Sequence, residues 1–198
     1  MTRYPKIIGL QAIPIEIIGK REFAISEGKT KTHKSVIVRV LTEDPKIDGV
    51  AEIVCAPPGK PEEIQHEVYA SIKVLLEKEL IGISAVDTMS AVKKMDECIK
   101  GKSWTKGGLN VALNDLRAKA LGISCMSMLG GDVNEVSVPV IGSVIGIMQP
   151  DRMAETALKL VADGFKTLKI KVGENLGLDV DRVRLVREAV GKEVGIRV

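Results

Sequence analysis

The first third of the chain alternates apolar and polar residues in the way that β-strands do. Three segments rich in isoleucine and valine lie at residues 7–18, 35–42 and 50–55. Turn-forming residues follow the second segment, where Glu43-Asp44-Pro45 leads on to Asp48-Gly49. We therefore expect an antiparallel meander of three strands, with a basic loop over residues 19–34 joining the first two.

The middle of the chain instead places its apolar residues at helical spacing. A first helix is expected to open at Pro61 and continue to Leu80, and Asp87 is a suitable N-cap for a second helix that ends at Gly101. A third helix is expected over residues 109–121, ended by Gly122. Strands followed by helices are typical of an α+β domain.

After Gly130-Gly131 the order of the expected elements changes. Strands are expected at residues 136–140, 167–172 and 194–198, and the intervening helices at 150–161 and 180–190. A strand–helix–strand alternation indicates parallel βαβ units. The interpretation is thus an α+β domain over residues 1–131 and a parallel βα segment over residues 132–198.

The composition argues against some classes of binding partner. Five of the 198 residues are aromatic, so a surface that stacks nucleic-acid bases is excluded, and a net charge of +3 does not favour a nucleic-acid partner. The positive charge is concentrated in residues 19–34, which favours either a solvated loop or a loop that meets an anionic small molecule.

The spacing of the cysteines and the polar residues near the N-terminus bear on the cellular location of the protein. Cys55, Cys98 and Cys125 are far apart in the sequence, so neither a disulfide framework nor a zinc site is expected. Gln11, Pro14 and Glu16 interrupt the apolar N-terminal segment, so no signal peptide, membrane span or membrane partner is expected. We expect a cytoplasmic protein.

Two lysines on one expected strand carry the candidate chemistry. Lys169 and Lys171 share one face of the segment 167–173, while Leu168 and Ile170 lie on the other. An ordinary half-exposed strand would leave both lysines in water. Strands of βαβ units are usually covered on both faces, however, and an ammonium is costly in such a place. Neighbouring ammonium groups lower each other's pKa, as a lysine base working near neutral pH requires.

Several segments together resemble the enolase superfamily, and within it the muconate-lactonizing, dipeptide-epimerase and mandelate-racemase groups. They are residues 109–122 (LNVALNDLRAKALG), Leu129-Gly130-Gly131 and residues 164–173 (GFKTLKIKVG). The resemblance implies an α+β capping domain over the mouth of a TIM-like (β/α) barrel. It also implies a small carboxylate substrate, whose α-proton is abstracted to give an enediolate stabilised by Mg²⁺.

The resemblance also assigns residues. Lys171 corresponds to the base, and Lys169 to the companion that tunes it and steadies the substrate carboxylate. Ser143 falls near a substrate-facing hydroxyl of some relatives. Phe23 and Ile25 lie in the first of two expected capping loops, residues 23–29 and 55–59, which close over the substrate and set specificity.

The sequence departs from the family pattern in two places. The usual Gly-x-Gly-Glu after the second strand is here Gly49-Val50-Ala51-Glu52. The sequence given stops at Val198, where the family would supply its first metal-binding Asp, so we expect no metal ligand in this chain. The leading hypothesis is the N-terminal part of a Mg²⁺-dependent cycloisomerase, epimerase or racemase, truncated and inactive alone. The alternative is a non-catalytic, truncated capping-domain scaffold or remnant that self-associates or needs another chain to complete the barrel. A homo-oligomer is expected.

Overall fold

The computed structural model of the chain describes residues 4–26, 28–56, 63–132, 140–141 and 144–198, without the side chain of Arg21. Contacts divide the chain into two units. Unit 1 consists of Met1–Ile18 and Thr32–Val136, and unit 2 of Gly19–Lys31 and Ser137–Val198. Among the described residues, no helix has both the length and the apolar character needed to cross a membrane.

Unit 1 is built on a three-stranded sheet in the order β1-β2-β3. The strands are β1 (Ile7–Ile25), β2 (Gly28–Thr42) and β3 (Gly49–Val54). β2 and β3 are antiparallel, with Ser35 opposite Val54 and Val40 opposite Gly49. Residues of β3 are alternately buried and exposed, as expected for a sheet that is covered on one face. The predicted meander is confirmed.

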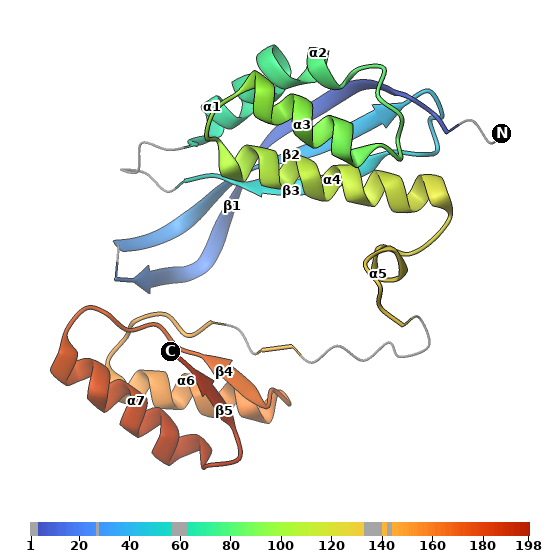
Figure 1. Cartoon of the computed structure of the whole chain (residues 1–198). Coiled ribbons are helices and arrows are strands. Elements are labelled where there is room, and N and C mark those ends of the chain that lie inside the picture. Colours follow the sequence, from blue (N-terminus) through green and yellow to red (C-terminus); the bar gives the residue numbers. More distant parts are fainter. Residues whose placement is uncertain (1–3, 27, 57–62, 133–139, 142–143) are drawn as a thin grey trace. The chain divides into compact units, whose positions relative to one another are not determined.

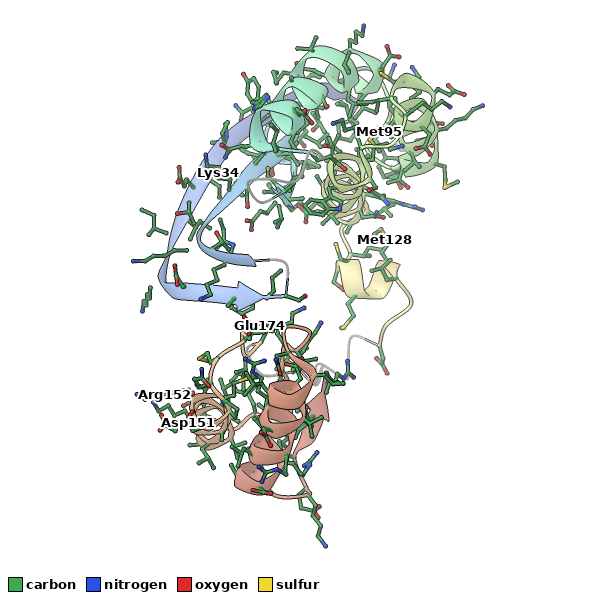
Figure 2. All side chains as sticks on the ribbon, turned by 90° about the vertical axis from the view of Figure 1, so that its left-hand side faces the viewer. Lys34, Met95, Met128, Asp151, Arg152 and Glu174 are labelled. Atoms are coloured by element: carbon green, nitrogen blue, oxygen red, sulfur yellow. The ribbon has the colours of Figure 1, made fainter. Side chains whose placement is uncertain are left out.

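Helices cover that one face of the sheet (Figure 1). One continuous helical segment is formed by α1 (Gln65–Ala70), the π-wound η1 (Ser71–Leu76) and α2 (Glu77–Leu80). It is followed by α3 (Thr88–Cys98), α4 (Ser103–Leu121) and the short α5 (Cys125–Met128). Met95 of α3, labelled in Figure 2, is fully buried in the core that these helices share with the sheet. The expected α+β fold is confirmed.

The basic stretch differs from the prediction, because it is not a loop. β1 continues through the lysine- and glutamate-bearing residues to Ile25, and β2 begins again at Gly28. Exposed, charged side chains on a two-stranded ribbon resemble those of a loop in sequence, since neither segment needs to bury an apolar face. The stretch predicted as a connection is therefore the distal part of a long hairpin.

The first helix also begins later than predicted, at Gln65 rather than at Pro61, and Glu63 has another role. Glu63 is 5% exposed, with a left-handed φ of 57°. Its carboxylate accepts hydrogen bonds from the backbone N–H groups of Trp104 (2.9 Å) and Thr105 (2.7 Å). These donors belong to the first turn of α4, so Glu63 caps that helix, which begins at Ser103 rather than at residue 109.

Unit 2 contains two parallel strands, each preceded by a helix. The elements are α6 (Pro150–Ala162), β4 (Thr167–Lys169), α7 (Leu176–Val190) and β5 (Gly195–Arg197). β4 is parallel to β5, and a parallel bridge joins Ile145 to Ile170 on its other side. The predicted βαβ units are confirmed, whereas the strand predicted at residues 136–140 lies almost wholly outside the described residues.

Two adjacent glycines of α4 give a matched test of the packing of this helix on β3. A Cβ at Gly108 would overlap the side chain of Ile53, whereas a Cβ at Gly107 meets no atom within 4 Å. Gly107→Ala should raise the free energy of unfolding by about 0.5–1 kcal/mol through helix propensity. Gly108→Ala should lower it by about 1–2 kcal/mol, because overpacking outweighs the same gain. Denaturation followed by the fluorescence of Trp104, the single tryptophan, measures both, and equal effects would contradict this packing.

Candidate functional site

Lys169 is the last residue of β4, and Lys171 lies two residues beyond it, because the strand predicted over residues 167–172 ends at Lys169 in the structure. Leu168 and Ile170 are fully buried in the core of unit 2, and Lys169 and Lys171 are partly buried. Residues two apart on a strand lie about 7 Å from each other on the same face. Within the described part of the chain, neither ammonium group has a hydrogen-bond or ion-pair partner. Both amines are thus available to a ligand.

Backbone pairing with Ile145 fixes the positions of Lys169 and Lys171 along the strand direction. The N–H of Ile145 donates to the carbonyl of Lys169, and the N–H of Lys171 donates to the carbonyl of Ile145, each at 2.9 Å. On the other side, the N–H of Ile170 donates to the carbonyl of Arg197. The lysine segment is therefore hydrogen-bonded on both sides, as in the interior of a parallel sheet.

The tip of the hairpin belongs to the same unit and reaches the segment that follows Ile145. The N–H of Ile147 donates to the carbonyl of Ala24 at 2.9 Å. Gly146 permits this approach, because a Cβ there would lie 3.0 Å from the Ala24 carbonyl and 3.2 Å from the ring of Phe23. The structure thus brings the predicted specificity residue Phe23 to the segment that pairs with the lysine strand.

A cavity of about 500 Å³ lies beside this contact. Ile25, Ser26 and Lys29 of the hairpin line it together with Glu174 and Arg182. Neither Lys169 nor Lys171 is among its lining residues. The second predicted specificity residue, Ile25, therefore faces a cavity separate from the face that carries the two lysines.

Sequence reasoning missed Arg182, which is 2% exposed on α7. Its guanidinium donates to the carbonyl of Met148 (2.8 Å), to Asp179 (2.7 Å) and to Glu174 (3.1 Å). Helical spacing contained the signal, since Arg182 lies four residues before the fully buried Val186 and so occupies the inward face of the helix. A charge at an apolar position indicates a group that is paired.

Asp179 links this arginine to the strand that carries the lysines. One carboxylate oxygen accepts from Arg182, and the other accepts from the N–H of Gly173 at 2.9 Å. Gly173 has a φ of 108°, which only glycine adopts readily. Desolvation raises the pKa of Asp179, but the hydrogen bonds from Gly173 and Arg182 outweigh it, so that the pKa lies below its ordinary value.

The remaining predicted site residues fall outside this cluster. Ser143 lies outside the described residues, as do residues 57–59 of the second expected capping loop. Cys55, at the start of that loop, is buried in unit 1. Desolvation, followed by the charge of Glu63, raises the pKa of its thiol, which makes it an unreactive core residue.

Among the described residues, no group of three or more His, Cys, Asp or Glu side chains is placed to hold a metal ion. The guanidinium of Arg182 donates to both Asp179 (2.7 Å) and Glu174 (3.1 Å). A divalent cation does not fit this cluster, because two carboxylates that already share an arginine are too few oxygen ligands for it.

Family models match both units of the chain. The model described as "Mandelate racemase / muconate lactonizing enzyme, N-terminal domain" matches residues 13–130, more than half of the chain. The chain belongs to this family. A second model, "Enolase C-terminal domain-like", matches residues 152–198, so the resemblance to the enolase superfamily is confirmed over both units.

Individual members of the family are about one-third identical to the chain over the region that they share with it. D-Ala-D/L-Ala epimerase of Cytophaga hutchinsonii is 32% identical over 96% of the chain and 50% of its own length. N-succinyl-L-Arg/Lys racemase of Bacillus cereus is 32% identical over 98% of the chain and 51% of its own length. The chain thus spans about half the length of these relatives.

Solved structures agree with this assignment. A dipeptide epimerase from Enterococcus faecalis, complexed with Mg and the dipeptide L-Leu-L-Tyr, superposes with a TM-score of 0.85 and 27% identity. The comparison covers 98% of this family member and 52% of the epimerase. The fold of the chain is therefore that of an enolase-superfamily enzyme over its N-terminal half.

The lowered pKa of Asp179 predicts how the stability of unit 2 depends on pH. A carboxylate with a depressed pKa stabilises the folded state above its ordinary pKa of about 3.9, and this contribution is lost as the pH falls through the depressed value. Asp179→Asn should therefore be less stable than the wild type at pH 7, and the difference should shrink at about pH 3. Hydrogen exchange of peptides covering residues 167–190 measures it.

Asp181→Asn is the matched control, because Asp181 lies on the same helix and forms an exposed ion pair with Arg184 at 3.1 Å. Its removal should change protection little at either pH. A difference between wild type and Asp179→Asn that stays constant from pH 7 to pH 3 would contradict the assigned interaction.

Proposed function

We propose that the chain contributes the base and the substrate-capping hairpin of an isomerase that abstracts the proton α to a carboxylate. The observation that carries this proposal is the pair Lys169 and Lys171, two partly buried amines on one strand face with no partner among the described residues. A pair of amines kept beside a hydrophobic core without compensating carboxylates favours a ligand that supplies the negative charge.

The two lysines take different roles in this proposal. Lys171, in its neutral form, accepts the α-proton of the substrate and becomes an ammonium. Lys169, in its charged form, pairs with the substrate carboxylate and reduces the negative charge that develops as the proton leaves. Delivery of a proton to the opposite face of the same carbon, by a donor from outside the described residues, gives epimerisation or racemisation. Expulsion of a β-oxygen of a lactone from the same carbanion instead breaks the ring C–O bond, which is cycloisomerisation in its ring-opening direction.

Amino-acid derivatives are the substrate class that the relatives favour. The epimerase and racemase described above act, by their names, on D-Ala-D/L-Ala and N-succinyl-L-Arg/Lys, both of which have an α-proton beside a carbonyl carbon. Mg²⁺ is present in the dipeptide epimerase complex. Because the described residues offer no ligand set for it, the ion would need ligands from outside the described ranges.

Exchange of the α-proton with solvent tests this proposal. The protein, expressed with the reading frame that contains it, is incubated with Mg²⁺ and a panel of dipeptides and N-acyl amino acids in deuterated buffer. Deuterium incorporation, followed by NMR, is expected for the wild type and should fall by about 100-fold or more in Lys171→Ala.

Lys166→Ala is the matched control, because Lys166 is an exposed lysine of the same segment whose backbone carbonyl, not its side chain, pairs with Gly195. Exchange in this variant should equal that of the wild type. Undiminished exchange in Lys171→Ala would remove the role given to that residue, and no exchange by the wild type with any substrate would remove the proposed function.

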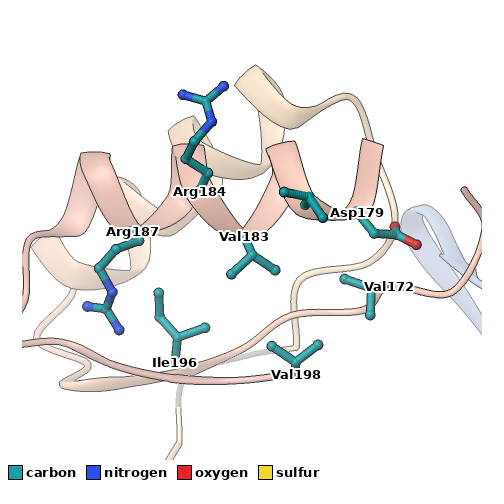
Figure 3. A pocket seen from close by; sticks show the side chains of 8 residues that line it. Val172, Asp179, Val183, Arg184, Arg187, Ile196 and Val198 are labelled. Atoms are coloured by element: carbon teal, nitrogen blue, oxygen red, sulfur yellow. The ribbon is translucent and has the colours of Figure 1, made fainter. Parts of the chain in front are cut away.

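A specific observation also favours the alternative, a scaffold that associates with itself. An apolar groove of about 620 Å³ lies between α7 and β5. Figure 3 shows Val183 of α7 pointing toward Ile196 and Val198 of the strand segment. Val198 is 66% exposed and Val180 is 59% exposed, so the groove presents apolar surface to solvent.

Under this alternative, residues 1–198 expressed alone should form dimers or larger assemblies. Ile196→Glu places a charge in the groove and should shift the chain to monomer, whereas Leu158→Glu, on the exposed face of α6 away from the groove, should not. Light scattering after size-exclusion chromatography measures the mass. A wild-type monomer would contradict the scaffold reading.

A further inference from the structure

We infer that Arg182 and Asp179 act as positioning residues that set the location of Lys171, an inference that rests on the proposed function for its catalytic meaning. Neither residue lies on the strand that carries the two lysines. Both belong to α7, and together they contact the segment that pairs with the lysine strand, at Met148, and the continuation of the lysine strand itself, at Gly173.

The guanidinium of Arg182 contacts three separate stretches of unit 2. It donates to the Met148 carbonyl, three residues after Ile145, and to Glu174, three residues after Lys171. Its third contact is Asp179, on its own helix at 2.7 Å. A planar guanidinium with several fixed donors can hold three acceptors at defined angles, which a lysine ammonium cannot do in the same way.

Asp179 completes the link to the lysine. Its second oxygen accepts from the N–H of Gly173, two residues beyond Lys171, at 2.9 Å. The side chain of Asp179 is 12% exposed and that of Arg182 3% exposed, so solvent competes little for these hydrogen bonds. Asp179 of α7 therefore binds the end of the lysine segment at Gly173. Arg182, its partner on the same helix, binds Met148 in the segment that pairs with the lysine strand.

The hydrogen bonds between Ile145 and the lysine strand explain why this matters for Lys171 in particular. Lys171 donates its N–H to Ile145, and both neighbours of this contact, at Met148 and Gly173, are tied to the Arg182–Asp179 pair. Loss of the Arg182 tie removes a hydrogen bond from the paired segment at Met148, and loss of the Asp179 tie removes one from the lysine segment at Gly173. Lys169 lies two residues before Lys171 and is not affected in this way. Its carbonyl still accepts from the Ile145 N–H, and it still lies opposite Arg197 of β5.

The test compares Arg182→Lys and Asp179→Asn with Arg184→Lys in the full chain. Arg184 lies on the same helix and also has two carboxylate partners, Asp181 and Glu188, but it is 53% exposed. The first readout is independent of activity: the NMR signals of the lysine side-chain methylenes in protein labelled with ¹³C-lysine, and the exchange rate of the Gly173 and Lys171 amides.

In Arg182→Lys and Asp179→Asn, we expect the Lys171 methylene signals to shift and the two amides to exchange about 10-fold faster, with circular dichroism unchanged. Arg184→Lys should reproduce the wild type. The second readout is α-proton exchange with the substrate found for the wild type, where kcat should fall by up to about 100-fold while KM stays within about twofold, because a displaced base affects the chemical step.

Each result bears on one proposal. Unchanged Lys171 signals and amide exchange in both variants would overturn the positioning role, whatever the activity. If the Lys171 signals shift in both variants while the wild type exchanges no α-proton with any substrate, the positioning of Lys171 would stand and the proposed function would be overturned. A rise in KM with unchanged kcat would also overturn the inference, since it would place the pair in substrate binding instead.

Discussion

The two-residue period of β4 and of the residues that follow it puts Lys169 and Lys171 on one face, and Leu168 and Ile170 on the other. The core of unit 2 contains few fully buried side chains, and Leu168 and Ile170 are two of them. A shift of one residue in register would bury two ammonium groups and expose both apolar residues, at a cost of several kcal/mol. The same hydrophobic core that stabilises the unit therefore dictates where Lys169 and Lys171 must point.

A buried arginine is the second constraint, and it concerns geometry more than stability. Desolvation of the guanidinium and of Asp179 offsets most of their attraction, and a buried ion pair can often be replaced by apolar residues without loss of stability. Apolar side chains cannot, however, hold the Met148 carbonyl and the Gly173 amide at fixed distances. The cluster therefore contributes more to the position of the strand end than to the stability of unit 2.

Local signals in the sequence were sufficient for the fold class and for several helix ends, whereas contacts between distant residues were not visible in it. The Asp87 cap of α3, whose side chain accepts from the Ser90 N–H, and the Gly122 end of α4 follow from residues within one helical turn, and both were predicted. Glu63 caps a helix some forty residues later in the chain, which no local pattern reveals. Likewise, the lysines follow from the period of one strand, but the contacts of Arg182 depend on how three segments pack.

The hairpin of β1 and β2 explains why the charged residues 19–34 were predicted to form a loop. Leu10 of β1 is buried in the core of unit 1, while Ala24, near the end of the same strand, accepts a hydrogen bond from Ile147 of unit 2. A two-stranded ribbon without a core beneath it has no apolar face to bury, so its sequence is as polar as that of a loop. Glycine at 146 then lets Phe23 approach the segment paired with the lysine strand.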